Sequence, residues 1–186
     1  MKKVLITGGT SGIGLATLSK LVLNYEVLFT YCSNETKALK LEEKYNIKGY
    51  RLDLNDKNSI EELVSKLNNI DILINNAGIA LDNDFNLKTY EEFSEVVNTN
   101  LTGTYYLTKL LVKKINHGGE IIFVSSTNGV DTPYIESIDY DASKAGVISL
   151  MQNMANMLAP DLRVNAVAPG WVNTKMNETL SEEFKK

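Results

Sequence analysis

The sequence is poor in cysteine, in histidine and in long apolar runs. Cys32 is its single cysteine and His117 its single histidine. An internal disulfide and a metal site built from His and Cys ligands are therefore excluded, and we expect a reducing compartment and no metal. No apolar run approaches the roughly 18 residues of a membrane-spanning helix. We expect no membrane partner.

An excess of basic residues is also missing. The chain holds 19 Lys and Arg against 23 Asp and Glu, a net charge of −4, whereas proteins that bind nucleic acid carry a basic surface. We expect no nucleic-acid partner. Met1–Lys3 is followed by only a short apolar stretch before Gly8, too short for the core of a secretory signal. We therefore expect a cytoplasmic location.

The composition is that of an ordinary globular protein. Of the 186 residues, 44% are hydrophobic and 23% are charged. No internal repeat, low-complexity segment or linker rich in Pro, Gly and Ser divides them. The sequence therefore predicts a single domain over residues 1–186.

Short apolar runs rich in Val, Ile and Leu alternate with helical stretches along the whole chain. The runs predicted as buried strands, of which the third is the weakest, are Val4–Thr7, Val27–Tyr31, Lys48–Leu52, Asp71–Asn75, Glu120–Ser125 and Arg163–Ala168. The predicted helices are Ile13–Leu23, Glu35–Tyr45, Ser59–Leu67, Glu91–Ile115 and Ala142–Leu158. Capping boxes predict two helix starts, at Ser59 with Glu62 and at Thr89 with Glu92.

This alternation predicts an α/β fold with a doubly wound parallel sheet of about six strands, a Rossmann fold. Strands that are apolar throughout are buried on both faces, so helices must cover both. Ligands of such sheets bind outside the carboxyl ends of the strands, where the winding reverses. The loops after the strands are therefore where we look for a site.

A glycine-rich turn lies between the first predicted strand and the first helix. Thr7–Gly14 has the spacing G-x-x-x-G-x-G. Small residues let the backbone approach a pyrophosphate closely, and the helix that follows offers free N–H groups. A tight turn without a ligand is the alternative interpretation of these residues alone.

Tyr140 and Lys144 stand four residues apart, a spacing that brings both side chains to one face of a helix. An ammonium group beside a tyrosine stabilises the phenolate and lowers the tyrosine's pKa toward neutrality. The alternative is a solvated pair on a helix surface. Ser126 follows a predicted strand, and by alternation its neighbour Ser125 should point the other way.

Taken together, these motifs resemble those of the classical short-chain dehydrogenases/reductases. Thr7–Gly14 is similar to that family's T-G-x-x-x-G-x-G motif and Asn75–Gly78 to its N-N-A-G motif. The resemblance continues through Asn100, Ser126, Tyr140-x-x-x-Lys144 and Pro169–Thr174, and so covers the whole chain in order. The wording of the motifs is closest to that of 3-oxoacyl-(acyl carrier protein) reductases.

The resemblance implies a dinucleotide site. The residues that it assigns to cofactor binding are Gly8, Thr10, Ser11, Gly12, Ile13, Gly14, Ser33, Asp53, Asn76, Ala77, Gly78, Tyr140, Lys144, Pro169, Gly170, Val172 and Thr174. It implies that Asp53 contacts the adenine, that Asn75 braces the central strands and that Thr174 binds the nicotinamide carboxamide. A turn aspartate is the alternative for Asp53.

The resemblance also implies four catalytic residues and an activity. Ser126 would hydrogen-bond the reacting carbonyl oxygen, Tyr140 would protonate it, and Lys144 with a water held by Asn100 would resupply the proton. The expected function is reduction of a carbonyl to an alcohol by NAD(P)H, on a 3-oxoacyl thioester or a small ketone. The alternative is a cofactor-binding protein, or a truncated form, with little or no turnover.

The choice between NADP(H) and NAD(H) depends on the end of the second strand. An acid there would bind the ribose hydroxyls of NAD, but no acid occurs before Glu35. NADP(H) is therefore favoured, with Ser33, Asn34 and Lys37 as candidates for phosphate contacts. Against it, no Arg or Lys stands in that segment, and Ser11 occupies a position that is often basic in members preferring NADP.

The sequence also departs from the family pattern. Members run to about 250 residues, and Glu178–Lys185 looks like the first turns of their substrate-binding helix, so we expect the last strand of the family's sheet to be missing. The loop Thr127–Asp139 looks about one residue longer than usual, which bears on substrate fit. Trp171 either walls the substrate pocket or packs. The family pairs through the helices expected at Glu91–Ile115 and Ala142–Leu158, which implies a homodimer or homotetramer.

Overall fold

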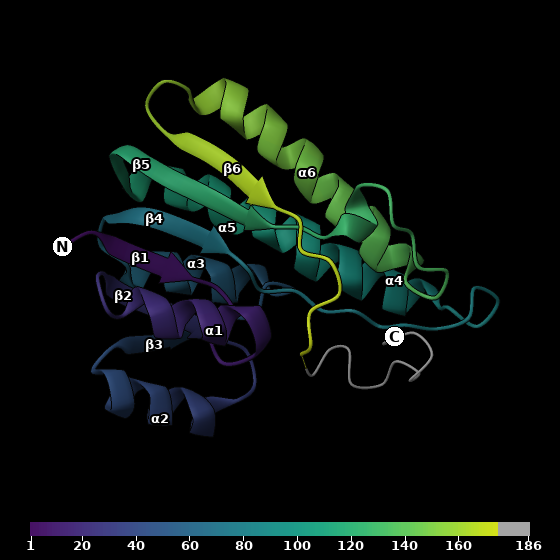
Figure 1. Cartoon of the computed structure of the whole chain (residues 1–186), viewed down its shortest axis with the longest axis horizontal. Helices are drawn as coiled ribbons and strands as arrows, with labels where there is room; N and C mark the ends of the chain where they lie inside the picture. Colours follow the sequence, from purple (N-terminus) through teal and green to yellow (C-terminus); the bar gives the residue numbers. More distant parts are fainter. Residues whose placement is uncertain (175–186) are drawn as a thin grey trace.

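Six parallel strands form one sheet in the order β3-β2-β1-β4-β5-β6 (Figure 1). A computed structural model describes residues 1–174 of the chain. The strands are β1 (Lys3–Ile6), β2 (Glu26–Tyr31), β3 (Lys48–Arg51), β4 (Ile70–Asn75), β5 (Ile115–Val124) and β6 (Arg163–Val167). Every neighbouring pair is parallel. The predicted doubly wound sheet is confirmed, and the strand order reverses between β1 and β4.

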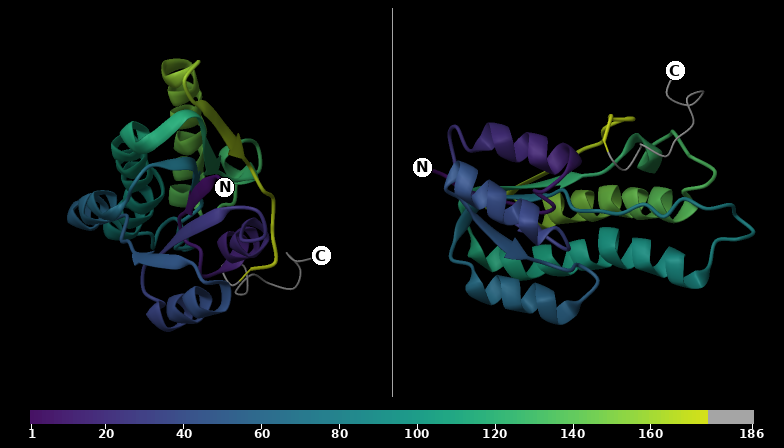
Figure 2. Two further views of the ribbon diagram at one scale, coloured as in Figure 1. Left: turned by 90° about the vertical axis from the view of Figure 1, so that its left-hand side faces the viewer. Right: turned by 90° about the horizontal axis from the view of Figure 1, so that it is seen from below.

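Helices cover both faces of the sheet (Figure 2). On one face lie α1 (Gly12–Leu21) and α2 (Glu35–Tyr45). On the other lie α3 (Lys57–Lys66), α4 (Tyr90–Val97), α5 (Thr104–Leu111) and α6 (Ile138–Leu158). Within residues 1–174, no helix is both long and apolar enough to span a membrane.

The central strands are apolar throughout because both of their faces are buried. Val4, Leu5 and Ile6 of β1 have no exposed surface. Ile6 packs in a core with Leu18 of α1 on one face, and Leu5 packs in a second core with residues of α3, α5 and α6 on the other. The two cores hold the sheet between the helix layers. Because all six strands are parallel, their carboxyl ends lie at one common edge of the sheet.

The helix expected over Glu91–Ile115 is interrupted, and this prediction was wrong in two respects. A π-helical turn over Asn98–Gly103 separates α4 from α5. A Cβ on Gly103 would lie 2.0 Å from the carbonyl oxygen of Leu54, so the helix passes directly against another backbone at this point. At the other end, Ile115 belongs to β5, where it pairs with Ile70.

One of the two predicted helix starts is confirmed. The Thr89 side chain accepts from the N–H of Glu92, and the Glu92 carboxylate accepts from that of Thr89, which makes the predicted capping box. At α3 the prediction was wrong. Asp56 caps that helix, because Ser59 is engaged elsewhere, accepting from the backbone N–H of Asp53.

The last predicted helix before β6 starts earlier than Ala142. It begins at Ile138, with Asp139 and Asp141 in its first turn, where acids favour the helix dipole. Tyr140 therefore lies inside α6 together with Lys144. The helix expected over Glu178–Lys185 falls outside the described residues.

Candidate active site

The glycine-rich turn after β1 adopts a backbone that only glycine accommodates. Gly8 and Gly12 have φ angles of +69° and +49°, a region that L side chains rarely occupy. At Gly14 the limit is space, because a Cβ would lie 2.2 Å from the carbonyl oxygen of Gly8 and 2.5 Å from the Asn76 side chain. The turn leads directly into the N-terminus of α1, which offers free N–H groups to an anion.

Thr7 and Asn76 join the ends of β1 and β4. The Thr7 hydroxyl accepts from the N–H groups of Asn76, at 3.0 Å, and Ala77, at 2.9 Å, while the Asn76 amide donates to the carbonyl oxygen of Thr7 at 2.9 Å. The expectation that Asn75 does this was wrong. Because neighbouring residues of a strand point to opposite faces, the Asn75 amide turns to α5 and donates to the Thr108 hydroxyl at 2.9 Å.

A pocket of about 570 Å³ runs along the carboxyl edge of the sheet, from the end of β2 across the reversal point to α6. Every residue assigned to cofactor binding from the sequence lines it, and so does Ser126. Residues that the sequence did not single out also line it, among them Thr30, Leu52, Leu54, Asn55, Ile79, Ala80, Asp82, Glu95, Thr99, Val124, Asn128 and Ser137. Most of these flank strand ends, so proximity to a predicted strand end was the signal available.

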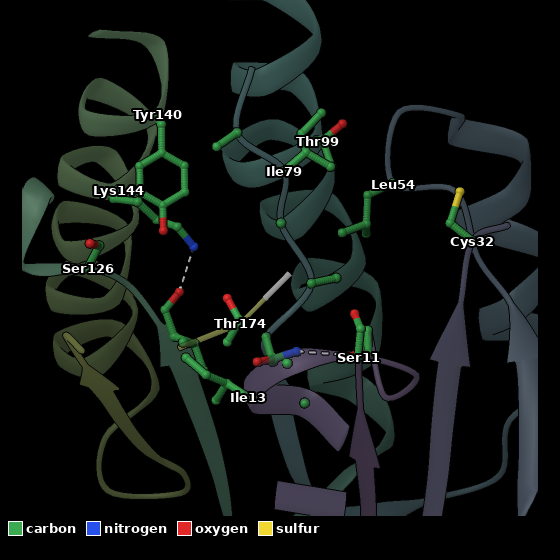
Figure 3. Close-up of a pocket in the computed structure, with 18 of the residues that line it drawn as sticks. Ser11, Ile13, Cys32, Leu54, Ile79, Thr99, Ser126, Tyr140, Lys144 and Thr174 are labelled. Carbon is green, nitrogen blue, oxygen red and sulfur yellow. Dashed lines mark hydrogen bonds between the residues drawn. The ribbon is translucent and has the colours of Figure 1, made fainter. Parts of the chain in front are cut away.

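Ser126, Tyr140 and Lys144 meet at one end of this pocket (Figure 3). The Lys144 Nζ lies 5.3 Å from the centroid of the Tyr140 ring and donates to the carbonyl oxygen of Val124 at 2.8 Å. Ser125 also lines the pocket, but its hydroxyl donates to the backbone oxygen of Lys144 at 2.8 Å. The two adjacent serines thus bond to different elements, Ser125 to α6 and Ser126 to Asn128 in its own turn.

The pKa of Tyr140 is raised in the ligand-free chain, which is opposite to the expected direction. Burial is the largest cause, and the charges of Asp141 and Asp82 add to it, while a hydrogen bond with Ser126 opposes them. The Lys144 ammonium, which donates to the main chain of β5, is not among the groups that shift this pKa. Tyr140 therefore holds its proton at neutral pH.

Burial lowers the pKa of Lys144 from its ordinary value of 10.5 to about 8. The side chain is only 4% exposed. Between pH 8 and 10.5 the unfolded chain holds a proton on Lys144 that the folded chain has lost, so raising the pH through this window stabilises the fold. Burial therefore destabilises the protonated form, which is the one present below pH 8.

We expect the free energy of unfolding to rise between pH 8 and 9.5 and Lys144→Met to remove that rise. The full window is worth on the order of 3 kcal/mol. Equilibrium denaturant unfolding at several pH values measures this free energy. Subtracting the value for Lys144→Met from that of the unmodified protein at each pH removes the contributions of the other titrating groups. Tyrosines with raised pKa, such as Tyr140 and Tyr31, oppose the rise only above about pH 10. Parallel pH curves for the two proteins would contradict the prediction.

Asn100 lies behind the pocket wall and not among its lining residues. It is buried in the π-helical turn, where its amide accepts from the N–H of Ile79 and donates to the Ile79 carbonyl, both at 2.8 Å, and to the Ser143 hydroxyl at 3.1 Å. A Cβ on Gly78 would lie 3.0 Å from the Asn100 oxygen and 3.5 Å from the Lys144 Nζ. Asn100 therefore fixes the loop after β4 close to Lys144.

A buried ion pair anchors the first turn of α6. Lys88 and Asp139 are 2.9 Å apart, with side chains 5% and 0% exposed. Asp139 also accepts from the N–H of Tyr140 at 2.8 Å, and Lys88 also donates to the carbonyl oxygen of Leu81. The sequence did not single out this pair, because the partners are far apart along the chain.

The outer half of the pocket lies beyond the ends of β2 and β3. The Asp53 carboxylate accepts from the N–H of Asn55 at 2.9 Å, so it makes a turn of its own as well as lining the pocket. Ser33 also lines it, and the Asn34 side chain caps α2 by accepting from the N–H of Lys37. Cys32 stands at the same end (Figure 3).

The segment after β6 completes the pocket wall. Pro169 accepts from the N–H of Thr127 at 3.0 Å, which brings the exits of β5 and β6 together. Thr174 lies over the glycine turn, where a Cβ on Gly12 would approach the Thr174 methyl to 3.4 Å. Trp171 lines the pocket and contacts the Tyr134 ring edge-on at 5.5 Å, so it packs, while a place in the wall of a substrate pocket stays a prediction. Among residues 1–174, no group of three or more acids, Cys or His could hold a metal ion.

A parallel sheet with a glycine turn at its reversal point is typical of α/β proteins that bind dinucleotides. In this chain Ser126, Tyr140 and Lys144 line the same pocket as that turn. Residues 2–185 match the family model described as short chain dehydrogenase. The chain belongs to this family, and it is an NAD(P)-dependent oxidoreductase.

Curated relatives agree. A 3-oxoacyl-[acyl-carrier-protein] reductase of Aquifex aeolicus is 37% identical over 198 residues, which cover 100% of this chain and 79% of that protein. An acetoacetyl-CoA reductase of Rhizobium meliloti is 34% identical over 187 residues, 96% of this chain and 77% of that protein.

Solved structures show the same fold. A short chain dehydrogenase from Burkholderia cenocepacia in complex with NADP has a TM-score of 0.93 at 26% identity and covers 99% of this chain and 80% of its own. The protein BdcA in complex with NADPH has a TM-score of 0.92 at 26% identity, covering 99% of this chain and 76% of its own.

Proposed function

We propose that this chain reduces a carbonyl group to an alcohol with NADPH, using Ser126, Tyr140 and Lys144, with Asn100 in support. One observation carries the proposal. The hydroxyls of Ser126 and Tyr140 converge at the inner end of the pocket, where Lys144 is buried beside them, while the glycine turn lies along the same pocket. A phenol, a hydroxyl and an ammonium at the end of a dinucleotide-sized groove suit reduction of a carbonyl.

The groove fits a dinucleotide. Gly8, Gly12 and Gly14 line the pocket without side chains, so a diphosphate could approach their backbone. The turn itself has no room for a Cβ at Gly14. Ala77 and Gly78 would border the ribose on the nicotinamide side, and Thr174 would meet the carboxamide. The chemistry that the cofactor supplies when bound is transfer of a hydride.

The residues of this chain would handle the oxygen of the substrate. Ser126 would donate a hydrogen bond to the carbonyl oxygen and stabilise the charge that develops there. Tyr140, which retains its proton because burial raises its pKa, would transfer that proton to the same oxygen. Lys144 would resupply it, and Asn100 would hold the water that connects the buried lysine to solvent.

NADPH is proposed in preference to NADH because no carboxylate stands at the end of β2. The relatives solved with NADP and NADPH support this choice. We expect Cys32→Asp to shift the ratio of kcat/KM for NADPH over NADH toward NADH by at least about tenfold, because a carboxylate repels a 2′-phosphate and accepts from ribose hydroxyls. Cys32→Asn, which has the same shape without the charge, is the control. An unchanged ratio in Cys32→Asp would argue against NADPH discrimination at this end of the pocket.

The substrate that we propose is a 3-oxoacyl thioester or a small ketone. Relatives named for 3-oxoacyl-acyl carrier protein and acetoacetyl-CoA support the first. NADPH consumption with a panel of both kinds of substrate tests the proposal. Saturable NADPH binding with no turnover on any member would instead favour the alternative, a cofactor-binding protein.

We further propose a cytoplasmic homodimer. Large apolar side chains are exposed on the helices that would pair, Tyr90 at 81% and Tyr105 at 40%, and apolar surface of this kind favours association. Sedimentation at micromolar concentration should give about twice the monomer mass. A monomer under these conditions would contradict the pairing.

A further inference from the structure

Asn128 lies between Ser126 and the acid next to Tyr140. The Ser126 hydroxyl donates to the Asn128 side-chain oxygen, and the backbone N–H of Asn128 donates to the Ser126 hydroxyl oxygen, both at 3.2 Å. The Asn128 amide nitrogen donates to Asp141 at 2.7 Å, and the other oxygen of Asp141 accepts from the N–H of Tyr134 at 2.8 Å. An unbroken chain of hydrogen bonds therefore links α6 to the hydroxyl that faces the substrate.

Asp141 fixes which way the Asn128 amide points. A carboxylate only accepts hydrogen bonds, so the NH₂ of Asn128 must face Asp141 and its oxygen must face Ser126. The backbone leaves this arrangement little freedom, because a Cβ on the next residue, Gly129, would lie 2.5 Å from the Lys144 carbonyl carbon. The turn that carries Asn128 is thus packed directly against α6.

We infer that Asn128 is a positioning residue that holds the Ser126 hydroxyl against Tyr140, with Asp141 locking the Asn128 amide. The inference rests on the proposed function, since only a carbonyl substrate gives the placement of Ser126 a role in catalysis. In the ligand-free site Asn128 accepts a hydrogen bond from the Ser126 hydroxyl, and the hydroxyl would donate to a carbonyl oxygen instead when that better-placed acceptor arrives. Ser126 therefore meets each substrate in one orientation.

The ionisation of Tyr140 reports where Ser126 lies. The charged groups that face Tyr140 are Asp141 and Lys144 from α6 and Asp82 from the loop after β4. Asp141 and Asp82 raise the pKa of Tyr140, and the hydrogen bond with Ser126 lowers it. The serine has one proton, which it donates to Asn128 in the ligand-free site, so Asn128 controls how far Ser126 can donate to the Tyr140 oxygen. Removing the Asn128 side chain should therefore change the pKa of Tyr140, and only through Ser126.

The test is a mutant cycle read by NMR, without cofactor or substrate. The pH titration of the Tyr140 ¹³Cζ signal, assigned with Tyr140→Phe, is compared in the unmodified chain, Ser126→Ala, Asn128→Ala and the double variant. We expect Ser126→Ala to raise the pKa of Tyr140, Asn128→Ala to shift it, and Asn128→Ala to have little further effect once Ser126 is absent. Full additivity, or no change in Asn128→Ala, would overturn the inference. Asn153→Ala, the same truncation at an exposed position of α6, is the matched control.

Kinetics form a second arm. We expect Asn128→Ala to lower kcat about tenfold, the worth of one hydrogen bond, with little change in the KM for NADPH. An unchanged kcat in Asn128→Ala would contradict the inference. Absence of turnover in the unmodified protein would defeat the proposed function, and the NMR cycle would still decide whether Asn128 positions Ser126.

Discussion

Tyr140→Phe should lower kcat for carbonyl reduction on the order of 10³-fold and leave NADPH binding nearly unchanged. The variant removes the phenol hydroxyl that we propose as the proton donor, and general acid catalysis contributes roughly 10²–10⁴-fold to such reactions. The ring itself remains, so the packing of α6 against the pocket is preserved. Steady-state kinetics on the carbonyl panel, with the NADPH dissociation constant measured separately, test both halves of this expectation.

Tyr90→Phe is the matched control, because it removes the same hydroxyl from a side chain that is 81% exposed and outside the pocket. Its kcat should equal that of the unmodified protein. The pH profile adds a second check. Since burial raises the pKa of Tyr140, reduction should hold through neutral pH and fall only at alkaline pH, where the proton is lost. Turnover in Tyr140→Phe comparable to that of Tyr90→Phe would show that another group supplies the proton.

Gly14→Ala should weaken NADPH binding on the order of 100-fold, about 2.7 kcal/mol. The new methyl group would lie 2.2 Å from the Gly8 carbonyl oxygen and 2.5 Å from the Asn76 amide. Neither can retreat easily, because Asn76 ties the ends of β1 and β4 together. The turn must therefore shift away from the position that a diphosphate would occupy. Isothermal titration calorimetry with NADPH measures the loss.

Strain of this kind also destabilises the fold, by roughly 1–3 kcal/mol, so the control must lose stability without touching the pocket. Gly118→Ala meets this need. Gly118 has a φ of +76° and nothing within 4 Å of its Cβ position, at an exposed site away from the pocket. It should unfold more easily and bind NADPH normally. Normal binding by Gly14→Ala would contradict a close approach of the cofactor to this turn.

Much of this architecture could be predicted from the sequence, because it depends on short-range geometry. A strand buried on both faces must be apolar throughout, as β1 is, and four residues bring Tyr140 and Lys144 to one side of any α-helix. Gly8, Gly12 and Gly14 form a turn whose backbone angles and clearances other residues do not allow. These features are local, so no partner elsewhere in the chain is needed to specify them.

The tertiary structure decided what depends on distant segments. The pKa of Tyr140 rises because burial outweighs the hydrogen bond with Ser126, and Asp82, from the loop after β4, adds to the rise. The long helix is interrupted by a π-helical turn, at whose end Gly103 packs against the backbone of Leu54. Asn76 joins the strands in place of Asn75, and Asn128 meets Asp141, for the same reason: a residue type and its spacing specify which bonds a side chain can make, while the fold determines which partner is within reach.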